Sequence, residues 1–267
     1  MSRANVRAIK HRADAFLRKA SPAYRLRRKR EAELAYWRGE LEHLRDWFQN
    51  GTRDWWGLKP PATEQKLNIS DLWVVNAVAT RNALRPTYWE RLRLEQGHFK
   101  GKRVLEVGSG PMAPILQFSD CTRHCIDPLV NLYMQAGWPL FAYDAKFVNT
   151  GGESLPYPDG YFDAVISVNA LDHVDDFERV ASEMQRVLKP GGGAYFEVEY
   201  HTPTVTEPLR LSDERVVRAF SGCDLKLITA RSGREVFETL VKRFNLVPFE
   251  FQHFGAAKFC TWHGIRK

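Results

Sequence analysis

The sequence predicts an α/β fold, with a mostly parallel sheet covered by helices on both faces and a helical extension before it. Two observations carry this prediction. From Gly101 onward, short apolar runs alternate with segments of helical periodicity, which is the pattern of parallel strands joined by helices. The 267 residues, 44% of them hydrophobic, suffice for one substantial core with an appendage. We therefore expect one main domain.

Residues 1–30 form a basic arm. They hold eleven basic residues and one acidic residue, a net charge of +10, whereas the whole chain carries +7 and residues 31–267 therefore carry −3. Apolar residues recur in the arm at helical spacing, at Val6, Ile9, Ala13, Phe16 and Leu17. A basic amphipathic helix suits an anionic membrane surface, and the charge alone would also attract nucleic acid. A solvated tail is the other interpretation.

An amphipathic helix follows the arm. Apolar residues between Leu34 and Phe48 recur at intervals of three and four, and Gly51 stands where such a helix would end. The next segment, residues 52–68, contains tryptophan, glycine and proline in a mixture that indicates an irregular connection. Helical periodicity then returns over residues 69–97, with an interruption near Pro86.

These features place a domain boundary near Gln65. Residues 1–65 would be the basic arm and amphipathic extension, and residues 66–267 the main domain. No stretch approaches the roughly 20 apolar residues that span a bilayer, and the N-terminus lacks the apolar centre of a secretory signal. We expect a cytoplasmic protein, peripheral to the inner face of a membrane if the arm binds lipid. The four cysteines are expected to be free thiols.

Strands and helices alternate in the main domain. The predicted strands are Arg103 to Val107, His124 to Ile126, Lys146 to Asn149, Phe162 to Val168, Ala194 to Tyr200, Val247 to Phe251 and Lys258 to Ile265. The predicted helices are Ala113 to Phe118, Phe177 to Leu188, Ser212 to Phe220 and Arg234 to Phe244. The last two strands are expected to pair in an antiparallel manner at the sheet edge.

A glycine turn, Gly108-Ser-Gly110, follows the first strand. Ligands of open parallel sheets bind beyond the carboxyl ends of the strands, and glycines let the backbone turn sharply and lie close to a ligand. Together with Ala113, these glycines also satisfy the G-x-G-x-x-G/A pattern of dinucleotide enzymes. The turn therefore predicts a nucleoside cofactor without deciding between a nicotinamide dinucleotide and S-adenosylmethionine.

Two acidic residues refine this prediction. Glu106 ends an otherwise apolar strand, and a buried carboxylate there would attract the ammonium and sulfonium groups of S-adenosylmethionine but repel a pyrophosphate. Asp127 lies 21 residues further on, at the end of the next strand, where it could accept hydrogen bonds from ribose hydroxyls. Asp127 supports either nucleoside, whereas Glu106 disfavours the nicotinamide oxidoreductase.

Three motifs resemble the type 11 family of class I methyltransferases. They are Val104-Leu-Glu-Val-Gly-Ser-Gly-Pro111, Leu155-Pro-Tyr-Pro-Asp-Gly-Tyr-Phe-Asp163 and Val187-Leu-Lys-Pro-Gly-Gly192, and the resemblance covers about residues 101–200. As a set, in this order and spacing, they are highly specific. The resemblance implies a Rossmann-like sheet of seven strands with an antiparallel C-terminal strand, S-adenosyl-L-methionine as methyl donor, and, as in most members, no required metal.

By position, the resemblance also implies cofactor contacts. The residues it assigns are Glu106, Gly108, Ser109 and Gly110 to the methionine part, Asp127 to the ribose, Glu153 and Ser154 to the adenine, and Asn169 to the methionine and methyl group. The chain departs from the family at Gly151, where an acidic residue is common. This departure puts the adenine contacts in doubt.

The acceptor side is expected after the fourth and fifth strands. His173 is the leading candidate for a general base toward an alcohol, because an imidazole titrates near neutral pH, and Asp172 would orient it or begin the next helix. Glu197, Glu199 and His201 share one strand face, so Glu199 and His201 could contact a polar acceptor or supply an alternative base. A metal held there is the least favoured role.

The sequence thus predicts a methyltransferase that O-methylates a small molecule such as a sugar, a glycolipid precursor or a secondary metabolite. N- or C-methylation, and cofactor binding without turnover, remain alternatives. Nucleic acid is a disfavoured acceptor, because the main domain is slightly acidic and lacks interleaved aromatic and basic residues.

Overall fold

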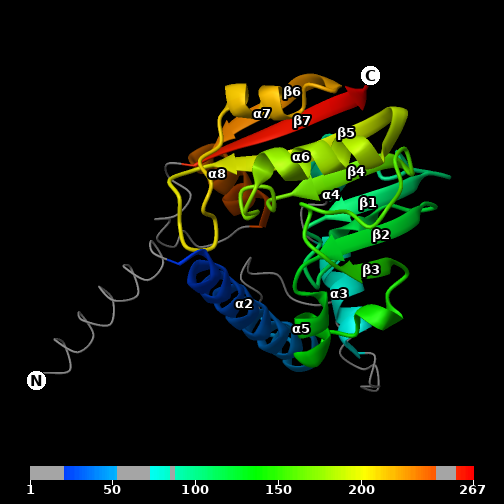
Figure 1. Cartoon of the computed structure of the whole chain (residues 1–267). Coiled ribbons are helices and arrows are strands. Elements are labelled where there is room, and N and C mark those ends of the chain that lie inside the picture. The colour runs from blue at the N-terminus through cyan, green and yellow to red at the C-terminus, as the bar shows by residue number, and fades with distance from the viewer. Residues whose placement is uncertain (1–20, 53–72, 85–87, 245–256) are drawn as a thin grey trace, which may run out of the picture.

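The computed structural model describes residues 21–52, 73–84, 88–244 and 257–267 (Figure 1). A single seven-stranded sheet has the order β3-β2-β1-β4-β5-β7-β6. Its strands are β1 (Arg103–Val107), β2 (Thr122–Asp127), β3 (Lys146–Asn149), β4 (Phe162–Val168), β5 (Leu188–Tyr200), β6 (Cys223–Ser232) and β7 (Lys258–Arg266). Strands β1 to β5 run parallel to one another, whereas β7 is antiparallel to both β5 and β6. This confirms the predicted fold class.

Helices cover both faces of the sheet. They are α2 (Pro22–Asn50), α3 (Trp73–Leu84), α4 (Tyr88–Arg91), α5 (Val130–Gln135), α6 (Phe177–Val187), α7 (Asp213–Ala219) and α8 (Gly233–Phe244). Two apolar clusters result, because neighbouring strand residues point to opposite faces. Val104 joins the cluster beneath α2, α3 and α5, whereas Leu105 and Val107 join the one beneath α6 and α7. None of the helices in the described ranges combines the length and apolar character needed to cross a bilayer.

The predicted amphipathic helix of the extension is α2. Ser21 caps its start by accepting a hydrogen bond from the Tyr24 amide, and Gly51, at φ +66°, ends it in the left-handed conformation. Leu44 and Trp47 on this helix are buried in the same cluster as Val104. The extension and the sheet therefore share one core, while the predicted boundary near Gln65 lies outside the described residues.

The C-terminal edge differs from the sequence prediction. On its outer side β7 pairs with β6, a strand that the sequence did not predict, and the predicted strand 247–251 lies outside the described residues. The predicted helix Ala113 to Phe118 is a shorter 3₁₀ turn, Pro114–Gln117. The predicted strand Ala194 to Tyr200 is longer in the structure, because β5 also includes the Lys-Pro-Gly-Gly segment and begins at Leu188, which pairs with Phe162.

Candidate functional site

The glycine turn leaves β1 in a conformation that only glycine adopts readily. Gly108 has φ +72° and Gly110 has φ +54°. A Cβ atom on Gly108 would lie 2.4 Å from the Cβ of Ala170, so the turn packs directly against the loop that follows β4. This contact brings the predicted cofactor turn beside the predicted acceptor loop.

Glu106 lies fully buried at the base of this turn. Its Oε2 atom accepts a hydrogen bond from the Ile115 amide at 3.2 Å, whereas Oε1 makes none with any described residue. Burial raises the pKa of Glu106 to about 8, although the Ile115 amide and the nearby Tyr88 hydroxyl act in the opposite direction. A buried carboxyl with one free oxygen fits a cationic ligand, which would restore its charged form.

Asp127 ties the end of β2 to the glycine turn. Its two oxygens accept hydrogen bonds from the amides of Gly110, at 3.1 Å, and Leu129, at 2.9 Å. Burial raises the pKa of Asp127 to about 6, although both amides lower it. Ribose hydroxyls would therefore meet an Asp127 side chain that its own backbone neighbours already fix in orientation.

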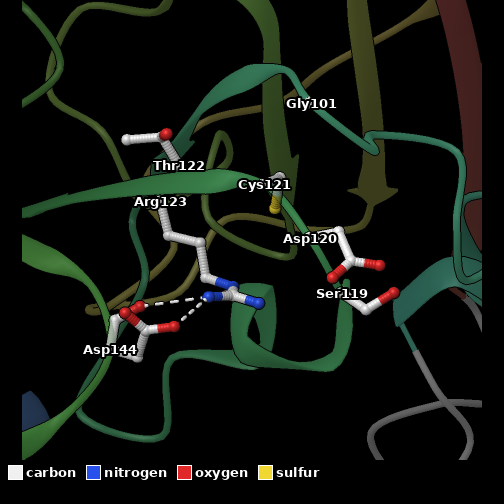
Figure 2. Close-up of a pocket in the computed structure, with 7 residues that line it drawn as sticks. All are labelled: Gly101, Ser119, Asp120, Cys121, Thr122, Arg123 and Asp144. Carbon is white, nitrogen blue, oxygen red and sulfur yellow. Dashed lines mark hydrogen bonds and ion pairs between the residues drawn. The ribbon is translucent and has the colours of Figure 1, made fainter.

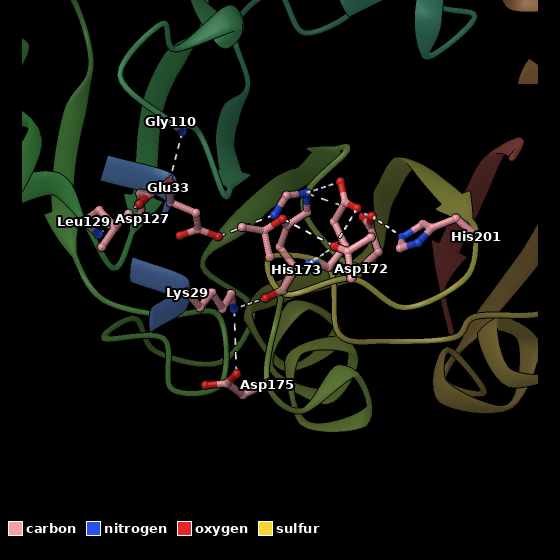
Figure 3. Close-up of polar contacts among 12 residues, drawn as sticks. Lys29, Glu33, Gly110, Asp127, Leu129, Asp172, His173, Asp175 and His201 are labelled. Atoms are coloured by element: carbon pink, nitrogen blue, oxygen red, sulfur yellow. Dashed lines mark hydrogen bonds and ion pairs between the residues drawn. The ribbon is translucent and has the colours of Figure 1, made fainter. Parts of the chain in front are cut away.

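Helix α2 lies across the glycine turn, a contact that the sequence did not predict. A Cβ atom on Gly110 would lie 2.9 Å from the Trp37 ring. One helical turn away, Glu33 Oε1 is 3.5 Å from His173 Nδ1. A turn further, Lys29 donates to the carbonyl oxygen of His173 and lies 3.7 Å from Asp175 (Figure 3). The spacing of four residues was the available signal, because it puts Lys29, Glu33 and Trp37 on one helix face.

The loop after β4 and the segment after β5 bring the predicted acceptor residues together. Asp172 is completely buried, and its Oδ2 atom is 3.1 Å from His201 Nε2 (Figure 3). His173 Nε2 lies 4.0 Å from the same oxygen and 3.7 Å from Glu207 Oε1. Glu207 was not singled out in the sequence, because it belongs to no regular element.

Neighbouring charges and burial shift the pKa values of the titratable groups around Asp172. The hydrogen bond to Asp172 raises the pKa of His201 to about 9 despite partial burial. Burial alone would lower the pKa of His173, but the hydrogen bond with Glu33 and the charges of Asp172, Glu33 and Glu207 raise it above the usual value. Burial, reinforced by Asp172 and Glu207, raises the pKa of Glu199 to about 7. His201 is thus largely protonated near neutral pH.

The two histidines differ in their free atoms. His201 uses Nδ1 toward the Thr202 carbonyl, at 2.8 Å, and Nε2 toward Asp172, so both ring nitrogens are engaged. His173 Nε2 is buried and makes no hydrogen bond with any described residue. Of the two predicted bases, only His173 has a ring nitrogen available to an acceptor.

The remaining predicted site residues lie around the same edge. Asn169, exposed and at φ +54°, follows β4 directly. Glu153 Oε1 accepts from the amide of Asp175 at 3.0 Å, so its carboxylate lies at the beginning of α6, while Ser154 is exposed. The structure therefore places the adenine candidates near the loop that carries His173.

Glu197 belongs to a separate buried network. Its Oε1 atom lies 2.5 Å from Arg91 on α4, and its Oε2 atom lies 3.3 Å from Arg231 on β6. Each carboxylate oxygen therefore faces an arginine from a different element. Glu197 shares a strand face with Glu199, but its ion-pair partners among the described residues are these two arginines and not His173 or His201.

A surface cavity of about 550 Å³ lies at the opposite edge of the sheet, near the beginnings of β1 and β2 (Figure 2). Its lining includes Gly101, Cys121 and Arg123, and Arg123 is paired with Asp144 at 2.5 Å. None of the predicted site residues lines this cavity. The candidate site therefore lies at the carboxyl ends of the strands, away from this cavity.

Comparisons with known proteins agree with this geometry. Residues 105–196 match the type 11 family described as a methyltransferase domain. A sterol 24-C-methyltransferase of Gibberella zeae is 36% identical over 101 residues, covering 34% of this chain and 26% of that protein. A ubiquinone/menaquinone biosynthesis C-methyltransferase of Stutzerimonas stutzeri is 32% identical over 126 residues, covering 43% and 49%. The chain thus matches less than half the length of each.

The fold has a solved counterpart. Phosphoethanolamine N-methyltransferase 2 of Haemonchus contortus, solved in complex with S-adenosyl-L-methionine, superposes with a TM-score of 0.54. The sequence identity is 14%, and the superposition covers 75% of this chain and 58% of that chain. This likeness concerns the arrangement of strands and helices.

Proposed function

Residues 105–196 of this chain belong to the type 11 methyltransferase domain family, and from this premise we propose that the protein methylates a small molecule with S-adenosyl-L-methionine as donor. The observation that carries the proposal is the glycine turn held between two buried carboxyls, Glu106 and Asp127. S-adenosylmethionine brings two positive groups and a ribose, which these residues can pair with. When bound, it supplies a methyl group on a sulfonium for in-line displacement.

The protein's own residues would then have three tasks. Glu106 Oε1 would accept a hydrogen bond from the ammonium group, and Asp127 would accept from the ribose. Gly108 and Gly110 would let the backbone approach the ligand closely. Trp37 of α2, which lies against Gly110, would form the outer wall of the site and exclude water.

We assign the acceptor to the neighbouring cluster of Asp172, His173 and Glu207. If the acceptor is an alcohol, its proton must leave as the oxygen–carbon bond forms and the carbon–sulfur bond breaks. His173 Nε2 is the free nitrogen that could take this proton. Glu33 and Asp172 would orient the imidazole and stabilise its positive form. This chemistry favours O-methylation of a polar, hydroxylated molecule such as a sugar.

Two alternatives have specific support. The relatives named above are C- and N-methyltransferases, so a carbon or nitrogen acceptor is the first alternative. The second is a protein that binds the nucleoside without turnover, which the contact of Trp37 with Gly110 favours, because α2 already covers the turn.

Calorimetry with the full-length protein tests the donor assignment. We expect S-adenosylmethionine and S-adenosylhomocysteine to bind at one site, and Asp127→Asn to weaken binding by about tenfold, because a charged acceptor is lost from the ribose. Asp144→Asn, which changes an exposed aspartate at the opposite edge, is the matched control. No measurable heat with either ligand would refute the donor assignment.

An acceptor panel tests the rest of the proposal. Sugars, glycolipid headgroups, phenols, amines and quinol precursors are incubated with methyl-labelled donor, and labelled products are separated. Transfer to a hydroxyl that falls at least about a hundredfold in His173→Gln supports the base role. Donor binding with no product from any acceptor class would favour the binding protein.

A further inference from the structure

Asp172, His173 and Glu207 present three donor atoms to one point. Asp172 and His173 follow β4, and Glu207 lies between β5 and α7. One oxygen or nitrogen from each side chain lies within 4.8 Å of the others. Donors that share a first-row cation at about 2.1 Å are at most about 4.2 Å apart. His173 Nε2 lies 3.7 Å from Glu207 Oε1 and 4.0 Å from Asp172 Oδ2, and both distances satisfy this limit.

Buried atoms without partners are an independent observation. Asp172 is completely buried, yet its Oδ1 atom makes no hydrogen bond with any described residue. His173 Nε2, which faces Asp172 and Glu207, is likewise buried and makes none. A buried polar atom without a hydrogen-bond partner is destabilising, so two of them side by side indicate a position for a ligand.

The neighbouring residues already hold the donors in position. His201 Nε2 lies 3.1 Å from Asp172 Oδ2, and Glu33 Oε1 lies 3.5 Å from His173 Nδ1. Metal-binding imidazoles and carboxylates commonly have such outer hydrogen-bond partners, which orient them. With Nδ1 turned toward Glu33, the ring presents Nε2 to the other two donors.

We infer that Asp172, His173 and Glu207 bind one divalent first-row cation. Two carboxylates balance its charge, and the mixture of oxygen and imidazole donors suits Mn²⁺ or Zn²⁺ better than Ca²⁺. Three protein donors leave coordination positions open, as in catalytic rather than structural metal sites. The cation takes the place of a proton at His173 Nε2, so this atom cannot act as the base in the cation-bound form. In that form, coordination by the cation would instead lower the pKa of an acceptor hydroxyl, which would lose its proton to solvent.

The open positions point to the kind of acceptor. A cation there binds oxygen ligands, and it would hold a molecule with two adjacent oxygens, such as a vicinal diol or a hydroxy acid. Ala170, which packs against Gly108, starts the same loop, so the cation and the glycine turn are neighbours. This part of the inference rests on the proposed methyl transfer, whereas cation binding itself does not.

Metal titration of the full-length protein tests the site without any cofactor. The protein is treated with chelator, and Mn²⁺ binding is followed by the paramagnetic resonance of the free ion, with Zn²⁺ measured by calorimetry. We expect one ion per chain with micromolar affinity. Glu207→Gln should weaken binding at least tenfold, because a charged ligand becomes neutral. Glu178→Gln, a glutamate paired with Arg215 outside the cluster, should leave it unchanged.

Asp172→Asn provides a second ligand variant, and thermal unfolding confirms that each variant is folded. Absence of one-to-one binding below about 1 mM would overturn the inference, as would equal affinity in wild type and both ligand variants. The carboxylates of the cluster would then have the neighbouring histidines as their ion-pair partners. Binding of S-adenosylmethionine is measured separately on metal-free protein, so failure of the donor assignment is distinguishable from failure of the cation site.

Discussion

Replacing Glu106 by glutamine tests whether its carboxyl is neutral in the folded protein. Burial raises the pKa of Glu106 from 4.5 to about 8, so the folded chain keeps a proton that the unfolded chain loses. The free energy of unfolding should therefore fall as the pH rises from about 4.5 to about 8, and not change further above that. The slope is about 1.4 kcal/mol per pH unit for one proton.

The measurement is urea unfolding of both proteins between pH 5.5 and 7.0, where the folded carboxyl stays protonated. Over this interval the wild type should lose about 2 kcal/mol more stability than Glu106→Gln, because glutamine does not titrate. Glutamine keeps the shape of the neutral acid and can still accept from the Ile115 amide. The same pH dependence in both proteins would refute the assignment of a raised pKa.

Cofactor binding supplies a second readout of the same carboxyl. If the ammonium of S-adenosylmethionine pairs with Glu106, binding at pH 7 should release close to one proton, because the cation favours the ionised form. Calorimetry in buffers with different ionisation enthalpies counts this proton. Glu106→Gln should release none from this position and bind more weakly. Equal proton release by the variant would show that another group is responsible.

Three further predictions concern stability and partners. Gly108→Ala should destabilise the protein by about 3 kcal/mol in urea unfolding, because φ is +72° and the added Cβ atom would lie 2.4 Å from the Cβ atom of Ala170. Gly191→Ala, at φ +75° with open space around it, should cost about 1 kcal/mol. Equal losses of stability in the two variants would contradict the clash with Ala170. Glu197→Ala should cost about 3 kcal/mol in the same assay, because Arg91 and Arg231 lose a buried partner. Glu178→Ala, which breaks an exposed ion pair, should cost under about 1 kcal/mol. Similar losses in the two variants would contradict the larger contribution of the buried network. Deleting residues 1–20, which removes six of the eleven basic residues of the arm and leaves α2 intact, should strongly weaken salt-sensitive binding to phosphatidylserine vesicles in a sedimentation assay. Undiminished binding would assign the vesicle contact to another part of the protein.

Three of the strands were predictable because their signals are local. Strands β1, β3 and β4 begin and end where the sequence predicts, since each combines β-branched or aromatic residues with turn residues close after it. Strand β6 was missed because it lies at the edge of the sheet and is only partly buried, so Leu225 and Leu227 alternate with polar residues instead of forming a continuous run.

The site was predictable where it depends on strand ends. Glu106 and Asp127 lie beside the glycine turn because β1 and β2 are parallel neighbours, and the motif order implied as much. The contribution of α2 was not predictable, because Trp37 meets Gly110 across 73 residues of chain and only tertiary packing decides which helix face meets the sheet. The contribution of Glu207 was not predictable either, because it lies in a segment without helix or strand periodicity.

The position of α2 has a consequence for the kinetics of ligand exchange. A nucleoside at the glycine turn would lie beneath Trp37, whose ring also packs against Tyr133 and Trp138. Nearer the amino end of the helix, Glu33 and Lys29 contact the loop that carries His173. The nucleoside could therefore leave only after this end of the helix moves away from the core. Departure of the demethylated nucleoside, rather than transfer itself, is then the step expected to limit turnover.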